Sequence, residues 1–587
     1  MLKINSYLTQ CDSHYEHVRR RSEALIEQEI NLAMHLACSY IMIDMPRGDK
    51  IENFAATINR FMANPCTQQK FVVRLEIPDN GTEAERIYQK FVEFKQLCEY
   101  STMLSVLLSF SCVESQVPDN FLLRFFGEKV FGLEFQMSCF ISNNKGFPVL
   151  SKQMAKVARE YMKVQARMIL APRLPNENLD RHFNYMTYLF ANHDKLDDED
   201  RHEVNYRNYL QSPLQPLADN LESTTYEIFE NDSIKYELYE QACFAAMQDK
   251  LRYGRFLQTK TPETPQPSDD VEMTGQKEPI VVMYFGAGRG PLIRRALSAA
   301  KNAKAPVHVI ALDKNPNAIV TLRNMIVDEG IEDQVTLLAG DMRHISVDKL
   351  QGDILISELL GSFGDNELSP ECLIPTEKYI KPGGIMIPWS YTNHVVPLSS
   401  QVLWNEVMLY AQQGVSGRVP MQQQLNPFEL PYVVRIYSAT YPCGPKSQDV
   451  FTFRHLPYPD RDELQALPQG GDQSLRCYDC KAFVVQENQA ELHGFAGYFT
   501  AELYQEIFYS IDPSKHTPGM HSWFPMYFPI KTPLRVHKGQ EVRIQVWRNN
   551  SQSKVWYEWA ISIFEGPKLV SRTHVHNTCG KGFSIGL

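Results

Sequence analysis

"PIVVMYFGAGRGPLIRRALSAAKNA", residues 279–303, carries the clearest structural signal in the chain. An apolar run leads into a glycine-rich turn, and a helical pattern follows with Pro291 in its first turn, where a missing N–H costs little. Further along, "PVHVIALD", "QVTLLAGD" and "GDILISE" repeat the apolar run, each ending in an acid. Alternating strand–helix units of this kind predict a doubly wound, Rossmann-like parallel sheet.

The glycine turn, residues 286–290, has glycine at alternate positions: Gly286, Gly288 and Gly290. A dinucleotide-binding loop of the form G-x-G-x-x-G would require glycine at 291, which is Pro291. The G-x-G-x-G form is instead typical of loops that bind S-adenosylmethionine, where a Cβ atom would block the close approach of the backbone. We therefore expect these three glycines to lie against that cofactor.

Acids follow the strands at the edge of the sheet where ligands bind. Asp313 ends the second strand, where a carboxylate can accept hydrogen bonds from ribose hydroxyls. Asp341 and Met342 end the third, where adenine would lie. A strand-terminal acid can also cap the next helix, and that alternative stays open for each of them.

The two-glutamate loop, "SELLGSFGDNELSPE" at residues 357–371, places Glu358 directly after a buried strand and returns Glu367 toward it. Two neighbouring carboxylates repel each other, which raises a pKa. An arginine guanidinium relieves that repulsion because it pairs bidentately with carboxylates. The pair is predicted to hold, polarise and deprotonate an arginine. A divalent-metal site and a solvated acidic loop remain as alternatives.

Five near-continuous apolar runs precede this core and alternate with helical patterns, which predicts a parallel sheet of the TIM-barrel type. They are "SYIMIDMP", "KFVVRLEIP", "LSVLLSFS", "VFGLEFQMSCFI" and "RMILAP". A TIM barrel has eight strands, so we expect an incomplete one.

The sequence predicts an α/β protein of four segments. Residues 1–190 form the TIM-barrel-like domain, and 191–279 form connector helices with an acidic linker rich in Pro, Thr and Ser at 258–279. Residues 280–388 form the Rossmann-like core. Residues 389–587 form an antiparallel β-barrel or sandwich, because runs such as "EVRIQVWRNN" alternate with Pro and Gly.

Composition narrows the function classes. The formal net charge is −10 over 587 residues, so a broadly basic nucleic-acid footprint is absent. The 12 cysteines are widely spaced, which favours reduced thiols over a disulfide framework. The N-terminus lacks a signal-peptide core and no run has the length of a membrane span. We expect a soluble intracellular protein that binds neither membrane nor nucleic acid directly.

Several motifs resemble the protein arginine methyltransferases, in particular their type II, symmetric-dimethylating branch. "GAGRGPL", "NPNA" and "SELLGSFGDNELSPECL" are similar to the catalytic core, and Glu358 and Glu367 match the double-E loop. "SPLQPLADNLESTTYEIFENDSIKY", "HGFAGYF", "PGMHSWFP" and "KVWYEWA" extend the likeness over 205–587, and "GFPVLSK" carries it to 146–152. The resemblance implies methyl transfer from S-adenosylmethionine, without metal, giving monomethyl and symmetric dimethyl arginine.

The resemblance also assigns residues that the patterns alone would place in a helix stripe or a packing cluster. It implies that Tyr226, Lys235 and Tyr236 contact the cofactor, with Lys235 at its methionyl carboxylate. Phe229 matches a phenylalanine associated with symmetric dimethylation. The resemblance also implies that Leu360, Ser522 and Trp523 lie on the substrate side, where Trp523 forms an aromatic wall.

The resemblance implies partners as well. Substrates are expected to be Arg-Gly-rich segments of histone tails and spliceosomal proteins, in the cytoplasm and nucleus. The family self-associates through its β domain, with contacts expected near residues 411–419. In the family, a WD-repeat adaptor docks on a complete barrel. Here the first two strands of the barrel are expected to be missing, as in a shortened isoform or gene model. Adaptor binding is therefore in question.

Rival functions follow from the same features. A non-catalytic scaffold would keep the fold and bind partners only. A dinucleotide oxidoreductase is disfavoured by Pro291, and a nucleic-acid methyltransferase by the acidic balance.

Overall fold

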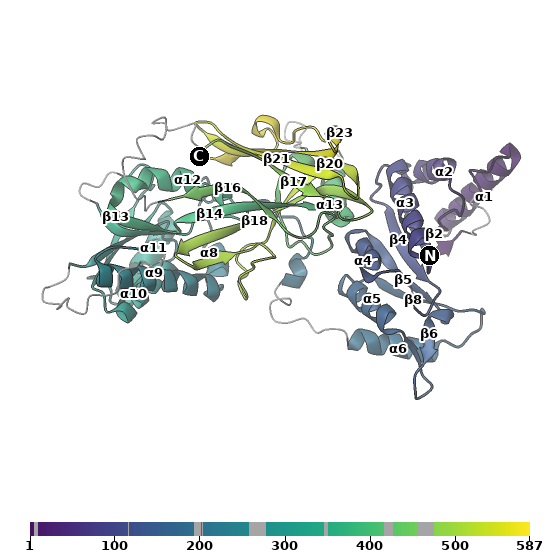
Figure 1. The fold of residues 1–587 in the computed structure, drawn as a ribbon, viewed down its shortest axis with the longest axis horizontal. Helices are drawn as coiled ribbons and strands as arrows, with labels where there is room; N and C mark the ends of the chain where they lie inside the picture. The colour runs from purple at the N-terminus through teal and green to yellow at the C-terminus, as the bar shows by residue number, and fades with distance from the viewer. Residues whose placement is uncertain are drawn as a thin grey trace.

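The computed structural model of the chain describes residues 1–4, 10–114, 117–192, 201, 203–257, 278–345, 350–415, 426–455 and 475–587. Most of the predicted linker (258–277) and part of the predicted self-association segment (416–419) lie outside them. In Figure 1 the C-terminal sheets, green to yellow, lie between the purple N-terminal domain and the teal helices of the middle domain.

The N-terminal domain is built on a parallel sheet in the order β1-β2-β3-β4-β5-β8. Its strands are β1 (Leu2–Lys3), β2 (Tyr40–Asp44), β3 (Lys70–Ile77), β4 (Leu104–Phe110), β5 (Val130–Gln136) and β8 (Arg167–Ala171). A short hairpin, β6 (Phe140–Ser142) and β7 (Pro148–Leu150), follows β5. The helices are α1 (Glu16–His35), α2 (Glu52–Met62), α3 (Gly81–Leu97), α4 (Asp119–Leu123), α5 (Lys152–Lys163) and α6 (Asp180–Ala191).

This sheet confirms the TIM-barrel-like prediction. The five predicted apolar runs form β2, β3, β4, β5 and β8, and every residue of β4 is buried, as two-sided coverage of a parallel strand requires. In the described residues the sheet is open, with β1 and β8 at its edges, so it is half-barrel-like rather than closed.

The middle domain is a five-stranded parallel sheet in the order β11-β10-β9-β12-β13. Its strands are β9 (Ile280–Phe285), β10 (Val307–Asp313), β11 (Val335–Ala339), β12 (Gly352–Ser357) and β13 (Ile380–Ile387). Its helices are α8 (Ser223–Glu230), α9 (Ser233–Tyr253), α10 (Pro291–Ala303), α11 (Pro316–Asp328) and α12 (Ser369–Leu373). The predicted Rossmann-like order is confirmed, with Pro291 at the first position of α10.

The C-terminal domain consists of two antiparallel sheets, which confirms the predicted sandwich class. The first is ordered β15-β20-β18-β14-β16, with β19 on β18; the second is ordered β17-β21-β22-β23, with β24 on β22. Their strands are β14 (Ser390–Leu398), β15 (Tyr432–Val433), β16 (Gln448–Arg454), β17 (Cys477–Val484), β18 (Gln489–Tyr504), β19 (Ile507–Ser510), β20 (Met526–His537), β21 (Glu541–Asn550), β22 (Lys554–Glu565), β23 (Lys568–Arg572) and β24 (Ile585–Gly586). The helix α13 (Gln401–Val415) follows β14.

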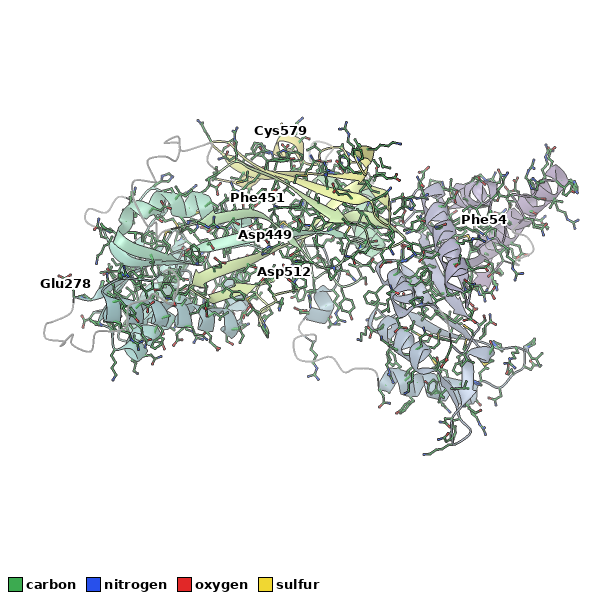
Figure 2. The ribbon with its side chains drawn as sticks, viewed as in Figure 1. Phe54, Glu278, Asp449, Phe451, Asp512 and Cys579 are labelled. Atoms are coloured by element: carbon green, nitrogen blue, oxygen red, sulfur yellow. The ribbon has the colours of Figure 1, made fainter. Side chains whose placement is uncertain are left out.

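The domains divide the hydrophobic core unequally. Phe54 belongs to a core confined to the N-terminal domain, whereas Phe451 belongs to one that continues into the middle domain, and Figure 2 shows these two residues far apart in the molecule. The middle and C-terminal domains therefore fold around a shared interior. The boundaries predicted at 190, 279 and 388 stay predictions.

A buried ion cluster joins the N-terminal domain to β18. The Lys95 ammonium lies 2.6 Å from a carboxylate oxygen of Glu128 and 2.6 Å from one of Glu491. The Tyr100 hydroxyl donates to the other oxygen of Glu491 at 3.0 Å. Breaking such a buried pair leaves an uncompensated charge, so the contact is specific to one arrangement of the two domains.

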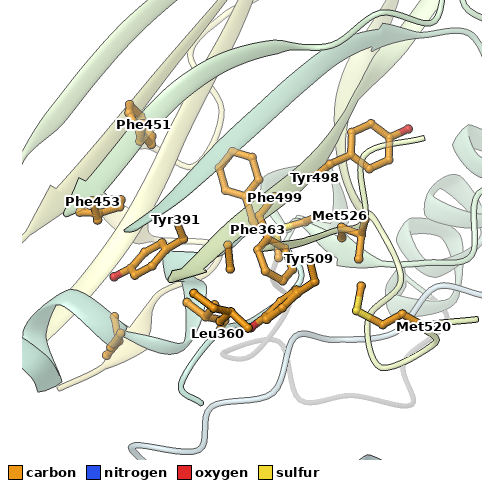
Figure 3. Close-up of a cluster of buried hydrophobic side chains, with 14 of the residues drawn as sticks. Leu360, Phe363, Tyr391, Phe451, Phe453, Tyr498, Phe499, Tyr509, Met520 and Met526 are labelled. Carbon is orange, nitrogen blue, oxygen red and sulfur yellow. The ribbon is translucent and has the colours of Figure 1, made fainter. Parts of the chain in front are cut away.

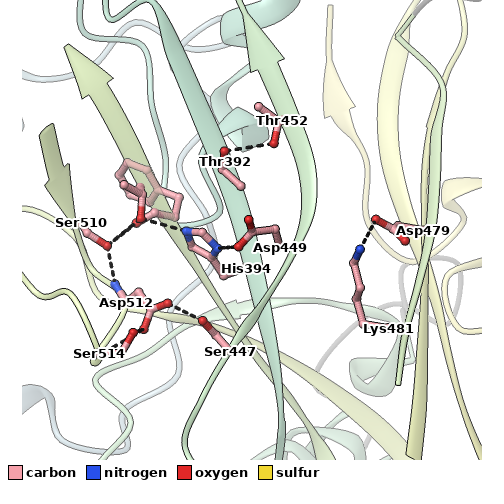
Figure 4. Close-up of polar contacts among 12 residues, drawn as sticks. Thr392, His394, Ser447, Asp449, Thr452, Asp479, Lys481, Ser510, Asp512 and Ser514 are labelled. Atoms are coloured by element: carbon pink, nitrogen blue, oxygen red, sulfur yellow. Dashed lines mark hydrogen bonds and ion pairs between the residues drawn. The ribbon is translucent and has the colours of Figure 1, made fainter. Parts of the chain in front are cut away.

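A second polar network ties four strands of the first C-terminal sheet together (Figure 4). The two ring nitrogens of His394 lie 2.8 Å from Asp449 and 2.8 Å from the Thr500 hydroxyl, which in turn lies 2.8 Å from the Ser510 hydroxyl. Burial lowers the pKa of His394, and Asp449 partly offsets that effect. The network satisfies buried polar groups inside the sheet.

All 12 cysteines are free thiols. Cys477 and Cys480, the one closely spaced pair, both lie on β17. Within the described ranges, none of the helices has both the length and the apolar character needed to cross a membrane.

Candidate active site

The glycine turn lies between β9 and α10, at the carboxyl edge of the parallel sheet. Gly286, Gly288 and Gly290 all have positive φ (78°, 53° and 90°), a region that L side chains rarely adopt. The Gly288 N–H donates to Asp313 Oδ2 at 2.7 Å, and the Asn315 N–H donates to Oδ1 at 2.7 Å. Burial raises the pKa of Asp313, and these two backbone donors partly offset the rise. Asp313 thus fixes the turn from the end of β10.

At two of these glycines, the position that a Cβ atom would occupy lies against another segment of the chain. A Cβ on Gly288 would lie 3.2 Å from the Tyr226 ring, and one on Gly286 would lie 2.9 Å from Leu359 and 3.7 Å from Met342. We call the surface formed by Gly286, Gly288, Tyr226, Met342 and Leu359 the cradle. On the side of the glycine turn, its wall consists of backbone rather than side chains. Glycine at both positions lets the other side chains of the cradle pack directly against the backbone of the turn.

Two further predicted cofactor positions, Gly290 and Asp341, adjoin this cradle in the chain. Gly290 turns its open side to α11, because a Cβ there would lie 2.6 Å from Met325. Asp341, two residues beyond β11, accepts hydrogen bonds from the Arg343 side chain at 2.7 to 3.1 Å. Burial tends to raise the pKa of Asp341, but these bonds outweigh it and the pKa is lowered.

The two-glutamate loop starts at the end of β12, which is separated from β10 by β9. Glu358 Oε2 lies 3.3 Å from the Lys235 ammonium of α9, and the two side chains are 16% and 1% exposed. Burial raises the pKa of Glu358, and Lys235 moderates the rise. Burial and then repulsion from Glu358 raise the pKa of Glu367 well above its ordinary value. The loop therefore brings the two carboxylates into one site.

Aromatic rings surround the Lys235 ammonium. It lies 4.6 Å from the ring centre of Tyr236, 4.9 Å from Trp523 and 5.7 Å from Phe229. Distances of this size give favourable cation–π attraction. The predicted residues of α8, α9 and the segment before β20 thus meet at the two glutamates.

Trp523 is held from three sides. Its ring stacks on Tyr509 (5.4 Å, 7°) and meets Phe499 edge-on (5.2 Å, 90°). Its indole N–H donates to the Leu360 carbonyl at 2.8 Å, which joins it to the two-glutamate loop. Figure 3 shows Phe499 and Tyr509 in the same buried cluster as Leu360. The resulting wall is rigid.

Comparison with known proteins places these features in a family. Three family models match consecutive parts of the chain: "PRMT5 TIM barrel domain" at 2–211, "PRMT5 arginine-N-methyltransferase" at 197–387 and "PRMT5 oligomerisation domain" at 390–585. The chain is 34% identical over 626 residues to protein arginine N-methyltransferase 5 of Oryza sativa subsp. indica, covering 100% of this chain and 88% of that protein. The chain belongs to the protein arginine N-methyltransferase 5 family.

Other relatives agree. Protein arginine N-methyltransferase 5 of Xenopus laevis is 34% identical over 603 residues (98% of this chain, 86% of that protein), and skb1 of Schizosaccharomyces pombe is 32% identical over 607 residues (100% of this chain, 88% of that protein).

Among solved structures, the match to the Trypanosoma brucei PRMT1 enzyme-prozyme complex with AdoHcy covers 61% of this chain and 97% of that chain, at 18% identity and a TM-score of 0.42. Arabidopsis thaliana protein arginine methyltransferase 10 covers 62% and 97% at 14% identity and 0.43.

The chain is thus an arginine N-methyltransferase that carries its family's TIM barrel and oligomerisation domains. Sequence reasoning missed one residue that organises this methyltransferase site. Asp232, fully buried, caps α9 by accepting from the Lys235 N–H at 3.4 Å. It also accepts from the backbone N–H groups of His521 and Ser522, at 2.9 and 2.8 Å, and from the Ser522 hydroxyl at 2.7 Å. The helix that carries Lys235 and the segment that carries Trp523 are thereby locked together.

Proposed function

We propose that this methyltransferase uses S-adenosylmethionine to modify protein arginine, giving monomethyl and then symmetric dimethyl products. The observation that carries the proposal is the site of Glu358, Glu367 and Trp523, where two carboxylates with raised pKa values meet aromatic rings around a cation. Carboxylate pairs and flat aromatic faces are the groups that recognise a planar guanidinium.

The chain's residues have distinct roles in this proposal. The cofactor supplies an electrophilic methyl group on a sulfonium. Glu358 and Glu367 orient the guanidinium so that one nitrogen faces that methyl carbon, and positioning of this kind lowers the barrier most. One of the two glutamates accepts the proton, a role that suits both because burial raises the pKa of each carboxyl. Trp523 confines the guanidinium plane.

We assign the cofactor to the surface beside this cradle. Gly286 and Gly288 keep the turn free of side chains, while Asp313 has remaining lone pairs for the ribose hydroxyls. Tyr226 and Met342 provide apolar surface, with Asp341 at the adenine end and Gly290 closing the turn onto α11.

The remaining assignments rest on the resemblance. Lys235 and Tyr236 bind the methionyl end of the cofactor, and Phe229 restricts the product to the symmetric form. Leu360 and Ser522 lie on the substrate side of the site. The substrates are Arg-Gly-rich segments of histone tails and spliceosomal proteins in the cytoplasm and nucleus. The protein works as a homo-oligomer, and its open N-terminal sheet puts the docking of a WD-repeat adaptor in question.

One experiment tests the activity. Purified full-length protein is mixed with methyl-labelled S-adenosylmethionine and an Arg-Gly-rich peptide, and the same peptide with lysine in place of arginine is the control. Mass spectrometry should find monomethyl and symmetric dimethyl arginine in the first peptide and no label in the second. Label in neither peptide would contradict the proposal and would favour a scaffold.

A further inference from the structure

Asp365 lies in the short turn Asp365–Glu367 that ends with the second glutamate, and its side chain is bonded to the C-terminal domain. Its side chain is 0% exposed, and it accepts three side-chain hydrogen bonds. The donors are the Asn393 amide on β14, the Arg548 guanidinium on β21 and, at 2.7 Å, the Tyr557 hydroxyl on β22. Three strands of the C-terminal domain thus hold one carboxylate of the two-glutamate loop.

Arg548 holds the loop at a second point. While its Nε donates to Asp365, its Nη2 donates to Glu371 Oε2 at 2.8 Å, and its Nη1 donates to the Leu475 carbonyl at 2.9 Å. Asp365 and Glu371 lie on either side of Glu367 in sequence. A fully buried arginine therefore brackets that glutamate, and the planar fork of arginine suits this two-point contact.

The rest of the loop has little freedom. Phe363 is fully buried against Phe528 (5.1 Å) and Tyr557 (5.6 Å) in T-shaped contacts. The Phe363 ring fills the space beside Gly497 of β18, where any other residue would have a side chain. A Cβ on Gly497 would come within 2.7 Å of the ring. Leu368, directly after Glu367, has a positive φ of 67°, a strained conformation for a residue with a side chain that persists only when its surroundings impose it.

We propose that Arg548 and Asp365 are positioning residues through which the C-terminal β domain places Glu367 against the substrate arginine. The inference rests on the proposed role of Glu367. Neither residue touches the reacting atoms; the polar contact between them sets where the turn stands relative to Glu358. A shift of about 1 Å in a reacting group can cost on the order of 100-fold in rate, so this contact controls turnover.

The test uses the full-length enzyme and a matched pair of variants. Tyr557→Phe removes one donor to Asp365 and keeps the ring against Phe363. Tyr527→Phe is the control: it removes the hydroxyl of an equally buried tyrosine on β20, away from the loop. That hydroxyl donates to the His493 carbonyl at 2.7 Å. Asp365→Asn is the stronger variant. Each is measured for Tm, kcat, and KM for cofactor and for peptide.

Tyr557→Phe is expected to lower kcat by roughly 10-fold, and Asp365→Asn by roughly 100-fold, with KM for the cofactor unchanged. Tyr527→Phe is expected to lose as much Tm as Tyr557→Phe and to keep kcat. In a plot of kcat against pH, the rise on the acidic side should also move to lower pH in Tyr557→Phe; we call this rise the acidic limb. The groups that face Glu367 are Glu358 and Lys235, and a displaced Glu367 would be better solvated and farther from the repelling Glu358.

Two results would overturn the inference: a kcat for Tyr557→Phe equal to that of Tyr527→Phe, or an unmoved acidic limb. Failure of the proposed function is distinguishable, because the unmodified enzyme would then transfer no methyl group to peptide arginine.

Discussion

The Lys235 ammonium lies 3.3 Å from Glu358 Oε2, so one of the two carboxylates at the site already has a cationic partner. With both glutamates ionised, Lys235, Glu358 and Glu367 together carry one net negative charge. One arginine guanidinium neutralises that charge. This charge balance suits a site that takes one arginine side chain at a time.

Replacing Glu358 with glutamine should stop turnover. Glutamine keeps the size but cannot balance the guanidinium charge, so we expect kcat to fall by roughly 100-fold or more while cofactor affinity stays near that of the unmodified enzyme. Glu329→Gln, an exposed position paired with Arg294, is the control and should leave both unchanged. Steady-state kinetics and calorimetric titration of the cofactor give the two quantities. Near-normal kcat in Glu358→Gln would remove this residue from the mechanism.

Glu367→Gln should inactivate the enzyme and yet stabilise it. The folded-state pKa of Glu367 is raised above its unfolded value, so the folded protein favours the protonated carboxyl. Ionisation costs no stability below the unfolded pKa; the cost grows as pH rises through the window between the two pKa values. Glutamine cannot ionise, so the Tm of the variant should exceed that of the unmodified protein at pH 8. The difference should shrink toward zero near pH 4.5, the ordinary glutamate value. A lower Tm for the variant at pH 8 would contradict the burial of this charge.

Gly288→Ala should weaken cofactor binding specifically. The new methyl group would stand 3.2 Å from the Tyr226 ring at a φ of 53°. Gly330→Ala is a matched control, because Gly330 has a φ of 64° and no atom within 4 Å of an added Cβ. Both should lose about 1–2 kcal/mol of folding free energy through left-handed strain. We expect only Gly288→Ala to lose cofactor affinity, by roughly 10-fold, since only there does the methyl group enter the cradle. Equal affinities in the two variants would show that the cofactor does not bind beside the cradle.

Phe229→Met should loosen product symmetry. The Phe229 ring lies 5.7 Å from the Lys235 ammonium at the wall of the site, and methionine is flexible enough to open space there. Ile228→Met changes the neighbouring position on α8, which is 65% exposed, and should leave the products as they are. Chromatographic separation of hydrolysed peptide should show asymmetric dimethyl arginine only from Phe229→Met. Unchanged products would remove Phe229 from the specificity argument.

The sequence predicted most of the fold because periodicity is local. Apolar runs indicated five strands of the N-terminal sheet and four of the middle sheet, among them β4 and β12, which are buried at every residue. It did not indicate β1, which has only two residues, nor β13, whose pattern is interrupted by Pro382, Gly383 and Gly384. The short length of the first and the turn residues in the second hide the strand signal.

The site was predicted in part for the same reason. Strand-end acids and the glycine turn are local signals, but the pairing of Lys235 with Glu358 joins residues 123 positions apart, which no pattern within one segment reveals. Arg548 could have been found. Alternate residues of β21, from Val542 to Asn550, are buried, and Arg548 falls on that inward face. An arginine at a core position requires a buried anionic partner, which in this chain is the turn beside Glu367.

The lysine shared by Glu128 and Glu491 has a consequence for how this enzyme can be divided. If the N-terminal half were removed, β18 would keep a carboxylate in an apolar setting without its counter-ion, on the very strand whose Gly497 receives Phe363. Trimming to a minimal catalytic fragment would therefore disturb the strand beneath the reaction centre, so the half-barrel is a structural support of methyl transfer.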